Sequence, residues 1–327
     1  MIKNFFKSRH IWNIRNSIAR FRKNFSNRGD KYSLSILDLL SDTFNRTFLG
    51  YFTRPFLYFN FLNNKKAEIN INELRENGFM KLSHLDDDLL EHFTKIFLKK
   101  SSQYYNSNFQ NIEDADEYFQ KNNIQRSNSI YLDVNDKKYL EFLKKNFISE
   151  IATNYLKKNK NNLYIVSFIF MLSKIDYKNE IERSGLQFPL NMNTEFEKKK
   201  FSTDSKNALH FHRDIDSYKF IKFFYYLSDC FVGNGHHKYI TKSHRVMKIA
   251  SAPYQRYLEE ELVNIYKDCE IIDIVGKKGF GFAEDTFGFH RGTPVTSKYR
   301  VMMMTQVKSS NRVGDSSIPL GNITNYN

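Results

Sequence analysis

The spacing of apolar and polar residues changes near residue 163 and divides the chain into two halves. In the first half, apolar residues recur every three or four positions, as they do on one face of a helix. This spacing predicts helices over residues 86–100 and 136–157. In the second half, short apolar runs alternate with turns such as Gly233–Asn234–Gly235, which is typical of the strands of a sandwich or barrel.

Predicted strands account for most of the second half. They cover residues 163–172, 208–212, 220–227, 238–241, 271–275, 280–283 and 299–307. One predicted helix, over residues 250–266, interrupts them. A further short unit, consisting of a helix end, a glycine turn and a strand, is predicted at 74–82. We therefore expect a β sandwich or barrel that follows a helical region.

Polar stretches connect these elements. Residues 101–135 are polar and are predicted to be irregular, and residues 178–206 are predicted to form a long loop that could act as a lid. The expected organisation has a basic, aromatic, helical extension, then one domain with its β core at about 163–308, and finally a polar tail. The three parts span residues 1–65, 66–308 and 309–327.

The N-terminal extension begins with a predicted amphipathic helix over residues 1–25. Its apolar face is formed by Ile11, Ile14, Ile18, Phe21 and Phe25. Residues 1–29 carry eight basic side chains and no acidic one. Such a helix could lie on an anionic membrane as a peripheral contact. Docking on the domain is the preferred interpretation, because amphipathic helices usually face a core.

Composition narrows the class of protein. Hydrophobic residues make up 41% and charged residues 26% of the 327 residues, which is typical of a globular protein. The net charge of +14 is concentrated at the N-terminus, and no zinc-finger, RNP or Walker pattern is found, so nucleic acid is not an expected partner. Two cysteines form no secreted disulfide framework, and neither a secretory signal nor an apolar run of roughly 18 to 20 residues is present. A cytoplasmic protein is expected, with peripheral contact at the inner membrane surface as an open alternative.

One group of residues carries candidate chemistry. His212 and Asp214 are two positions apart, so in an extended strand their side chains point to the same side. A third candidate ligand, His290, follows the last predicted turn. Two histidines and one carboxylate on one face, with open positions opposite, form the facial triad of non-haem Fe(II) oxygenases. Arg300, ten residues beyond His290, could bind a dicarboxylate through its two parallel N–H groups.

The order of these elements resembles a known family. The strings HFHRDID, KFFYYLSDCFVGNGHHKYITKSH and GFGFAEDTFGFHRGTPVTSKYR are similar to the phytanoyl-CoA dioxygenase (PhyH-like) family of Fe(II)/2-oxoglutarate oxygenases. LRENGFMKL, at 74–82, resembles the N-terminal opening of that family. The resemblance implies an α+β protein with a mainly β core, namely a double-stranded β-helix (jelly roll, cupin-like) with N-terminal helices packed around it.

The resemblance also implies roles for particular residues. His212, Asp214 and His290 match the iron ligands, and Arg300 matches the arginine that binds the distal carboxylate of 2-oxoglutarate. Thr293 stands where the family often has a small hydroxyl residue that assists this carboxylate. The implied activity is hydroxylation of a small or lipid-like organic substrate by Fe(II), 2-oxoglutarate and O2, with succinate and CO2 as coproducts. A carboxylate at Asp214 favours hydroxylation over halogenation, because halogenating relatives have a small residue there.

Other histidines of the second half are not interpreted as metal ligands. The Ser243–His244 pair matches a structural element of the family, but Lys242 replaces the glycine that commonly precedes it. His236 and His237 are interpreted as loop residues. His210 either lines the pocket or is a core histidine.

Two other functions remain alternatives at this point. One is a catalytically inactive jelly-roll binding protein, and the other is a zinc metallohydrolase that uses the same triad. Lys222 and the lysines at 198–200 are compatible with an anionic substrate or with a solvated basic surface.

Overall fold

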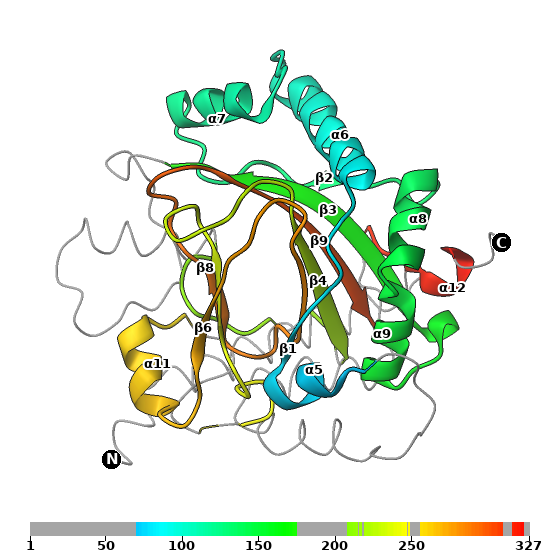
Figure 1. The fold of residues 1–327 in the computed structure, drawn as a ribbon, viewed down its shortest axis with the longest axis vertical. Helices are drawn as coiled ribbons and strands as arrows, with labels where there is room; N and C mark the ends of the chain where they lie inside the picture. Colours follow the sequence, from blue (N-terminus) through cyan, green and yellow to red (C-terminus); the bar gives the residue numbers. More distant parts are fainter. Residues whose placement is uncertain are drawn as a thin grey trace, which may run out of the picture.

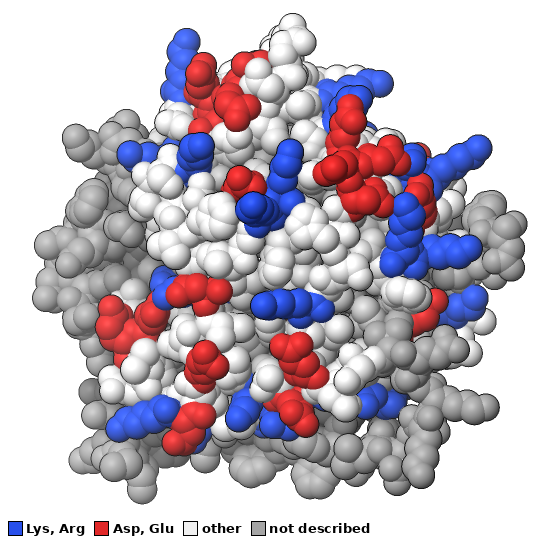
Figure 2. Space-filling view, viewed as in Figure 1, with Lys and Arg blue, Asp and Glu red and all other residues white. Residues whose placement is uncertain are grey.

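A computed structural model describes residues 70–174, 208–214, 216–217, 219–246, 248, 256–309 and 316–323. The predictions for the helix at 1–25, the rest of the extension to residue 65 and the loop at 178–206 lie outside the described residues. Within the described ranges, no helix is long and apolar enough to cross a membrane. Figure 2 shows acidic and basic side chains interspersed over the described part of one face, without a broad area of a single sign.

A seven-stranded antiparallel sheet, called here the large sheet, forms the centre of the molecule (Figure 1). Its strand order is β1-β7-β4-β9-β3-β10, and β2 pairs with β3. The strands are β1 (Phe79–Lys81), β2 (Ile130–Tyr131), β3 (Tyr164–Leu172), β4 (Phe220–Tyr226), β7 (Gly281–Glu284), β9 (Arg300–Lys308) and β10 (Ile318–Pro319).

A three-stranded sheet, the small sheet, has the order β6-β5-β8. Its strands are β5 (His237–Ile240), β6 (Ile271–Ile274) and β8 (His290–Gly292). His212 extends this sheet through an antiparallel bridge to His290. From β3 onwards the chain alternates between the two sheets. It leaves the large sheet at β3 for His212 at the small sheet, and it returns to the large sheet as β4. It then forms β5 and β6 in the small sheet, β7 in the large sheet, β8 in the small sheet and β9 in the large sheet. This alternation defines a double-stranded β-helix, so the predicted fold class is confirmed.

The helices mainly cover the outer face of the large sheet (Figure 1). They are α5 (Asn72–Asn77), α6 (Asp87–Tyr105), α7 (Ile112–Lys121), α8 (Lys137–Lys145), α9 (Ile148–Leu156), α11 (Glu259–Ile265) and α12 (Leu320–Ile323). Alternate residues of β4 divide between two cores, as the two-residue period of a strand requires. Phe223 and Tyr225 pack with Phe93 and Phe142 of the helices, whereas Phe224 and Tyr226 pack in the space between the sheets.

The helical half differs from the sequence prediction in two places. The helix expected at 136–157 is two helices, because the amide of buried Asn146 bonds the Phe142 carbonyl and Phe147 adopts a left-handed conformation with φ 52°. A hydroxyl from the large sheet, that of Tyr225, donates to the Asn146 side-chain oxygen and fixes this break. The stretch 101–135, expected to be irregular, contains α7 and β2. An Asn111–Asp114 capping box begins α7.

The second half follows the prediction more closely. The helix expected at 250–266 is described only as α11, which is shorter. The residues after 309 were expected to be a polar tail. Residues 318–323 instead form β10 and α12, and buried Leu320 and Ile323 join the core under the helices. The helix–turn–strand unit at 74–82 is confirmed, with Gly78 at φ 80° ending α5.

Candidate metal centre

Backbone pairing brings the two candidate histidine ligands together across 78 residues of sequence. The His212 N–H donates to the His290 carbonyl at 3.0 Å, and the His290 N–H donates to the His212 carbonyl at 3.1 Å. Two residues on, the Asp214 N–H donates to the Thr286 carbonyl at 2.8 Å. The segment that carries His212 and Asp214 is therefore held beside β8 and faces the space between the sheets.

The backbone hydrogen bonds of both imidazoles use the same nitrogen, Nδ1. His212 Nδ1 lies 2.8 Å from the His210 carbonyl oxygen, and His290 Nδ1 lies 3.0 Å from the Gly288 carbonyl oxygen. Because a carbonyl oxygen only accepts, each Nδ1 carries a proton and donates it. Each Nε2 then presents a lone pair when the ring is neutral, which is how metal-binding histidines are usually oriented.

The ligand atoms of His212, Asp214 and His290 all lie within 4.8 Å of one another. His212 Nε2 is 3.6 Å from Asp214 Oδ1, and His290 Nε2 is 3.3 Å from Asp214 Oδ2. Both histidines are buried, and the Asp214 side chain is mostly buried. The sequence-predicted triad is thus assembled as one group with its three donors converging.

The charges around the triad hold His212 and Asp214 in the forms that bind a cation but favour a proton on His290. Burial, Arg256 and His290 lower the pKa of His212 well below its ordinary value, so this ring is neutral near pH 7. Burial opposes ionisation of Asp214, but Lys222 and His290 outweigh it and hold the pKa of this carboxyl well below its usual range. For His290, burial is outweighed by Asp214, which raises its pKa, so a metal ion would compete with a proton there.

Arg300 lies at the start of β9 and is a buried cation, 3% exposed. Its Nη1 donates to the Gly235 carbonyl at 2.5 Å, while its Nε has no hydrogen-bond partner. No carboxylate of the described residues lies within ion-pair distance of this guanidinium. Gly292 of β8 leaves space beside it, since a Cβ there would lie 3.4 Å from Arg300 Nη2. A buried guanidinium without a counter-ion is costly, and an anionic ligand would satisfy it.

A second guanidinium lies nearby. Arg126 is 4.3 Å from the centroid of the Phe170 ring, and Arg300 is 5.8 Å from the same centroid. Burial and the neighbouring Arg300 both lower the pKa of Arg126. Two cations close together make this end of the inter-sheet space electropositive.

Thr293 lies beside His236. Its hydroxyl is 3.0 Å from the His236 carbonyl oxygen and 3.0 Å from His236 Nδ1, and His236 Nε2 is 2.7 Å from Asp273. The Thr293 carbonyl lines the same Gly235 turn that Arg300 contacts. The proposed assistance of the Thr293 hydroxyl to a bound carboxylate stays a prediction.

Sequence reasoning connected Lys222 with an anionic substrate or cosubstrate and missed its contact with Asp214. Its Nζ lies 2.6 Å from Asp214 Oδ2 and 2.8 Å from Asp216 Oδ2, and Gln306 donates to Asp216 at 2.6 Å. In the large sheet, Glu284, Lys222 and Gln306 are direct neighbours on adjacent strands. The sequence did contain a sign of this role, because Lys222 is a charged residue at an inward-facing position of an otherwise apolar strand. Its partners, however, depend on the register of that strand with its neighbours.

His237 and Glu284 form a second polar pair that sequence reasoning missed. His237 was expected to be a loop residue, but it begins β5 and is buried. Its Nε2 lies 3.0 Å from Glu284 Oε2. Glu284 is 0% exposed, and burial raises its pKa to about 8.

The Ser243–His244 element makes local backbone contacts. The Ser243 hydroxyl donates to the Ile240 carbonyl at 2.6 Å and accepts the Phe289 N–H at 2.8 Å, which links β5 to the start of β8. Lys242 occupies a left-handed position, φ 63°, where a glycine would be unstrained. His244 Nε2 is 3.1 Å from the Arg75 carbonyl oxygen.

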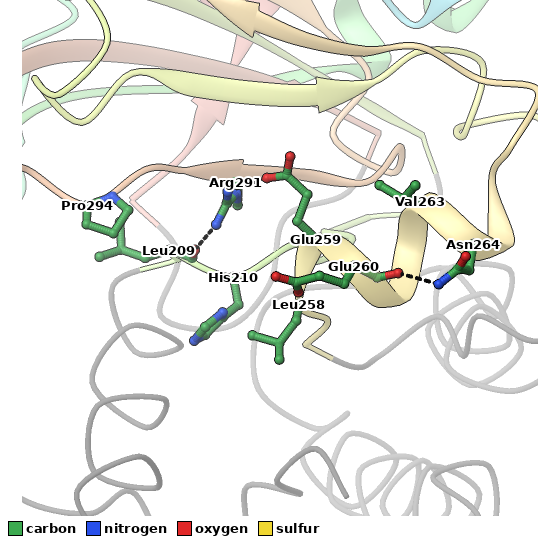
Figure 3. A pocket seen from close by; sticks show the side chains of 9 residues that line it. All are labelled: Leu209, His210, Leu258, Glu259, Glu260, Val263, Asn264, Arg291 and Pro294. Carbon is green, nitrogen blue, oxygen red and sulfur yellow. Dashed lines mark hydrogen bonds and ion pairs between the residues drawn. The ribbon is translucent and has the colours of Figure 1, made fainter. Parts of the chain in front are cut away.

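A cavity of about 570 Å³ lies away from the triad, between α11 and the segment that precedes His212 (Figure 3). Its lining includes His210, Leu209, Glu259 and Arg291. Arg291 follows His290 in β8 and therefore faces the opposite side of the small sheet. His210 thus lines this separate cavity and is not one of the three converging ligands.

The buried ammonium of Lys222 gives a stability prediction. Replacing Lys222 by methionine leaves Asp214 and Asp216 without their shared cation. We expect the free energy of unfolding of the metal-free protein to fall by about 3 kcal/mol. This value is at the lower end of the cost of breaking a buried ion pair, because Asp216 is partly exposed. Urea unfolding measures the loss. Lys238→Met, which removes a more exposed ammonium paired with Glu259, is the matched control and should cost less than about 1 kcal/mol. Equal losses would contradict the prediction.

Comparisons with known proteins give a limited result. No protein-family model and no curated protein sequence matches the chain. Among solved structures, EctD from S. alaskensis with 2-oxoglutarate and 5-hydroxyectoine is similar at 14% identity and a TM-score of 0.46, over 81% of this chain and 84% of that one. The non-heme alpha ketoglutarate dependent carbocyclase SnoK from nogalamycin biosynthesis is similar at 12% identity and a TM-score of 0.41, over 75% of this chain and 84% of SnoK. AviO1 from Streptomyces viridochromogenes is similar at 10% identity and a TM-score of 0.40, over 76% of this chain and 96% of AviO1. The assignment of the fold rests on the strand order of this chain.

Proposed function

We propose that this protein is an Fe(II)- and 2-oxoglutarate-dependent oxygenase of the PhyH-like type that hydroxylates a small organic substrate. One observation carries the proposal. A converging group of two histidines and one carboxylate faces the space between the two sheets. A buried guanidinium that has no carboxylate partner among the described residues faces the same space.

The residues fit both proposed ligands. Two imidazole Nε2 atoms and one carboxylate on one side are the donor set that Fe(II) takes in this class, once His290 has given up its proton, and they leave the opposite side for other ligands. Arg300 can pair with the distal carboxylate of a 2-oxo diacid. Lys222 is a weaker candidate for that carboxylate, because Asp214 and Asp216 already neutralise it.

The mechanism assigns each residue a specific task. Bound iron would couple the decarboxylation of 2-oxoglutarate by O2 to insertion of one oxygen atom into a substrate C–H bond, with the other entering succinate. His212, Asp214 and His290 would hold the metal from one side. Arg300 would fix the far end of the cosubstrate and so orient its oxo acid end toward the triad. The aromatic walls Phe170, Phe224 and Phe282 exclude water from the space.

The test uses Fe(II) and 2-oxoglutarate under anaerobic conditions. Chelation of iron by the oxo acid is expected to give a weak visible charge-transfer band that saturates with one equivalent of each. Zn(II) with 2-oxoglutarate is the control and should give no band. A protein that binds iron without developing the band, or that forms no succinate on admission of O2, would be an inert binding protein or a hydrolase and would overturn the proposal.

A further inference from the structure

The space between the triad and Arg300 holds one histidine that the proposed function does not use. His237 is on the small sheet, where its strand partner is Gly292, the residue that leaves room beside Arg300. Its ring is parallel to that of His290, with planes 4° apart and centroids 5.6 Å apart. His237 therefore lies between a candidate metal ligand and the buried guanidinium.

The ring of His237 packs against two phenylalanine rings and lies beside one carboxyl group. Its ring centroid is 5.2 Å from that of Phe224 and 5.5 Å from that of Phe282. His237 is 4% exposed, and neither ring nitrogen makes an aligned hydrogen bond within the described part of the chain. Nε2 approaches Glu284 Oε2 to 3.0 Å, so Glu284 restrains one edge of the ring and leaves Nδ1 for another partner.

Buried polar groups in folded proteins almost always have a hydrogen-bond partner, and one that lacks a partner calls for an ordered water, an ion or a functional role to explain it. We infer that His237 is a further cosubstrate-binding residue, whose ring N–H donates a hydrogen bond to an oxygen of 2-oxoglutarate between the metal and Arg300. This inference rests on the proposed function. The geometry supports it because a diacid that reaches from the triad to the guanidinium passes the edge of this ring, and the Phe224 and Phe282 rings that pack against it offer no donor.

Anaerobic titration of 2-oxoglutarate into the Fe(II)-loaded full chain tests the inference. The dissociation constant comes from the charge-transfer band, and iron affinity is measured separately before the cosubstrate is added. His237→Leu, which removes the donor, is expected to raise the dissociation constant about 10- to 100-fold and to move the band maximum. Iron affinity should stay within about twofold, since His237 is not one of the converging ligands.

Two further variants make the result specific. His237→Asn keeps a donor and should recover most of the affinity and the wild-type band position. His92→Leu removes a histidine that pairs with Asp136 in the helical layer and should change neither quantity. Thermal unfolding verifies that each variant is folded. If His237→Leu does not fold, His237→Met, which also lacks a donor, replaces it, and the dissociation constant is read from that variant.

The possible outcomes separate the two claims. A wild-type protein without a band refutes the proposed function and with it this inference. A wild-type band together with an unchanged dissociation constant and band maximum in the donor-less variant overturns the inference alone and means that His237 bonds an ordered water. A parallel loss of iron affinity would also overturn it, because His237 would then support the triad and not the cosubstrate.

Discussion

Replacing His212, Asp214 or His290 by alanine is expected to abolish succinate formation and to weaken Fe(II) binding by at least about 100-fold. Each substitution removes one of three converging donors. Changes in residues that only orient metal ligands already cost 10- to 100-fold in other metal sites, so removal of a donor should cost more. Anaerobic Fe(II) titration and a succinate assay measure the two effects.

The matched control for the histidine variants is His92→Ala. His92 is a partly buried histidine paired with Asp136, and it lies in the helical layer outside the inter-sheet space. Its replacement should leave succinate formation and iron affinity within about twofold of the wild type. Full activity in any of the three triad variants would contradict the assignment of that residue.

The aspartate variant needs a separate measurement of stability. Removing Asp214 also takes away the closest partner of the buried Lys222 ammonium, which then has only Asp216. Some loss of folding stability is therefore expected in Asp214→Ala that the histidine variants do not share. Asp214→Gly is the finer test of chemistry, since it should lose hydroxylation while the two imidazoles still bind iron weakly. Metal-free unfolding of each variant separates the two causes.

The parts of the site that sequence alone predicted share one property. His212 and Asp214 are adjacent positions on one side of an extended segment, and Arg300 follows His290 at a short, fixed interval. Local spacing is sufficient to relate such residues, and the bridge between His212 and His290 then brings the two groups together. Most strand positions followed from apolar runs broken by glycine turns, whereas the double-stranded β-helix was implied by the family resemblance.

The parts that sequence reasoning missed depend on pairing between distant strands. Lys222 and Glu284 become neighbours only through the register of β4 and β7, and His237 reaches Gly292 only through that of β5 and β8. No local spacing specifies these registers. The broken helix at Asn146 has the same cause, since the Tyr225 hydroxyl that fixes it comes from the large sheet.

Arg300→Ala is expected to raise the 2-oxoglutarate requirement about 30- to 150-fold with a much smaller effect on iron affinity. The guanidinium is buried and makes no ion pair within the described residues, so a bound carboxylate would be its counter-ion, and such a charge-assisted contact is worth about 2–3 kcal/mol. The dissociation constant of 2-oxoglutarate, read from the charge-transfer band, measures the loss.

Arg300→Lys provides the graded comparison. Lysine keeps the charge but loses the two parallel N–H groups, so it should fall between the wild type and the alanine variant. An unchanged requirement in Arg300→Ala would contradict the assigned role of this residue. Arg126, over the same Phe170 ring, would then be the cation to replace, since Lys222 is already neutralised by Asp214 and Asp216. If Arg126→Ala alone produces the large increase, the cosubstrate carboxylate is bound at the edge of β3 and not at the start of β9.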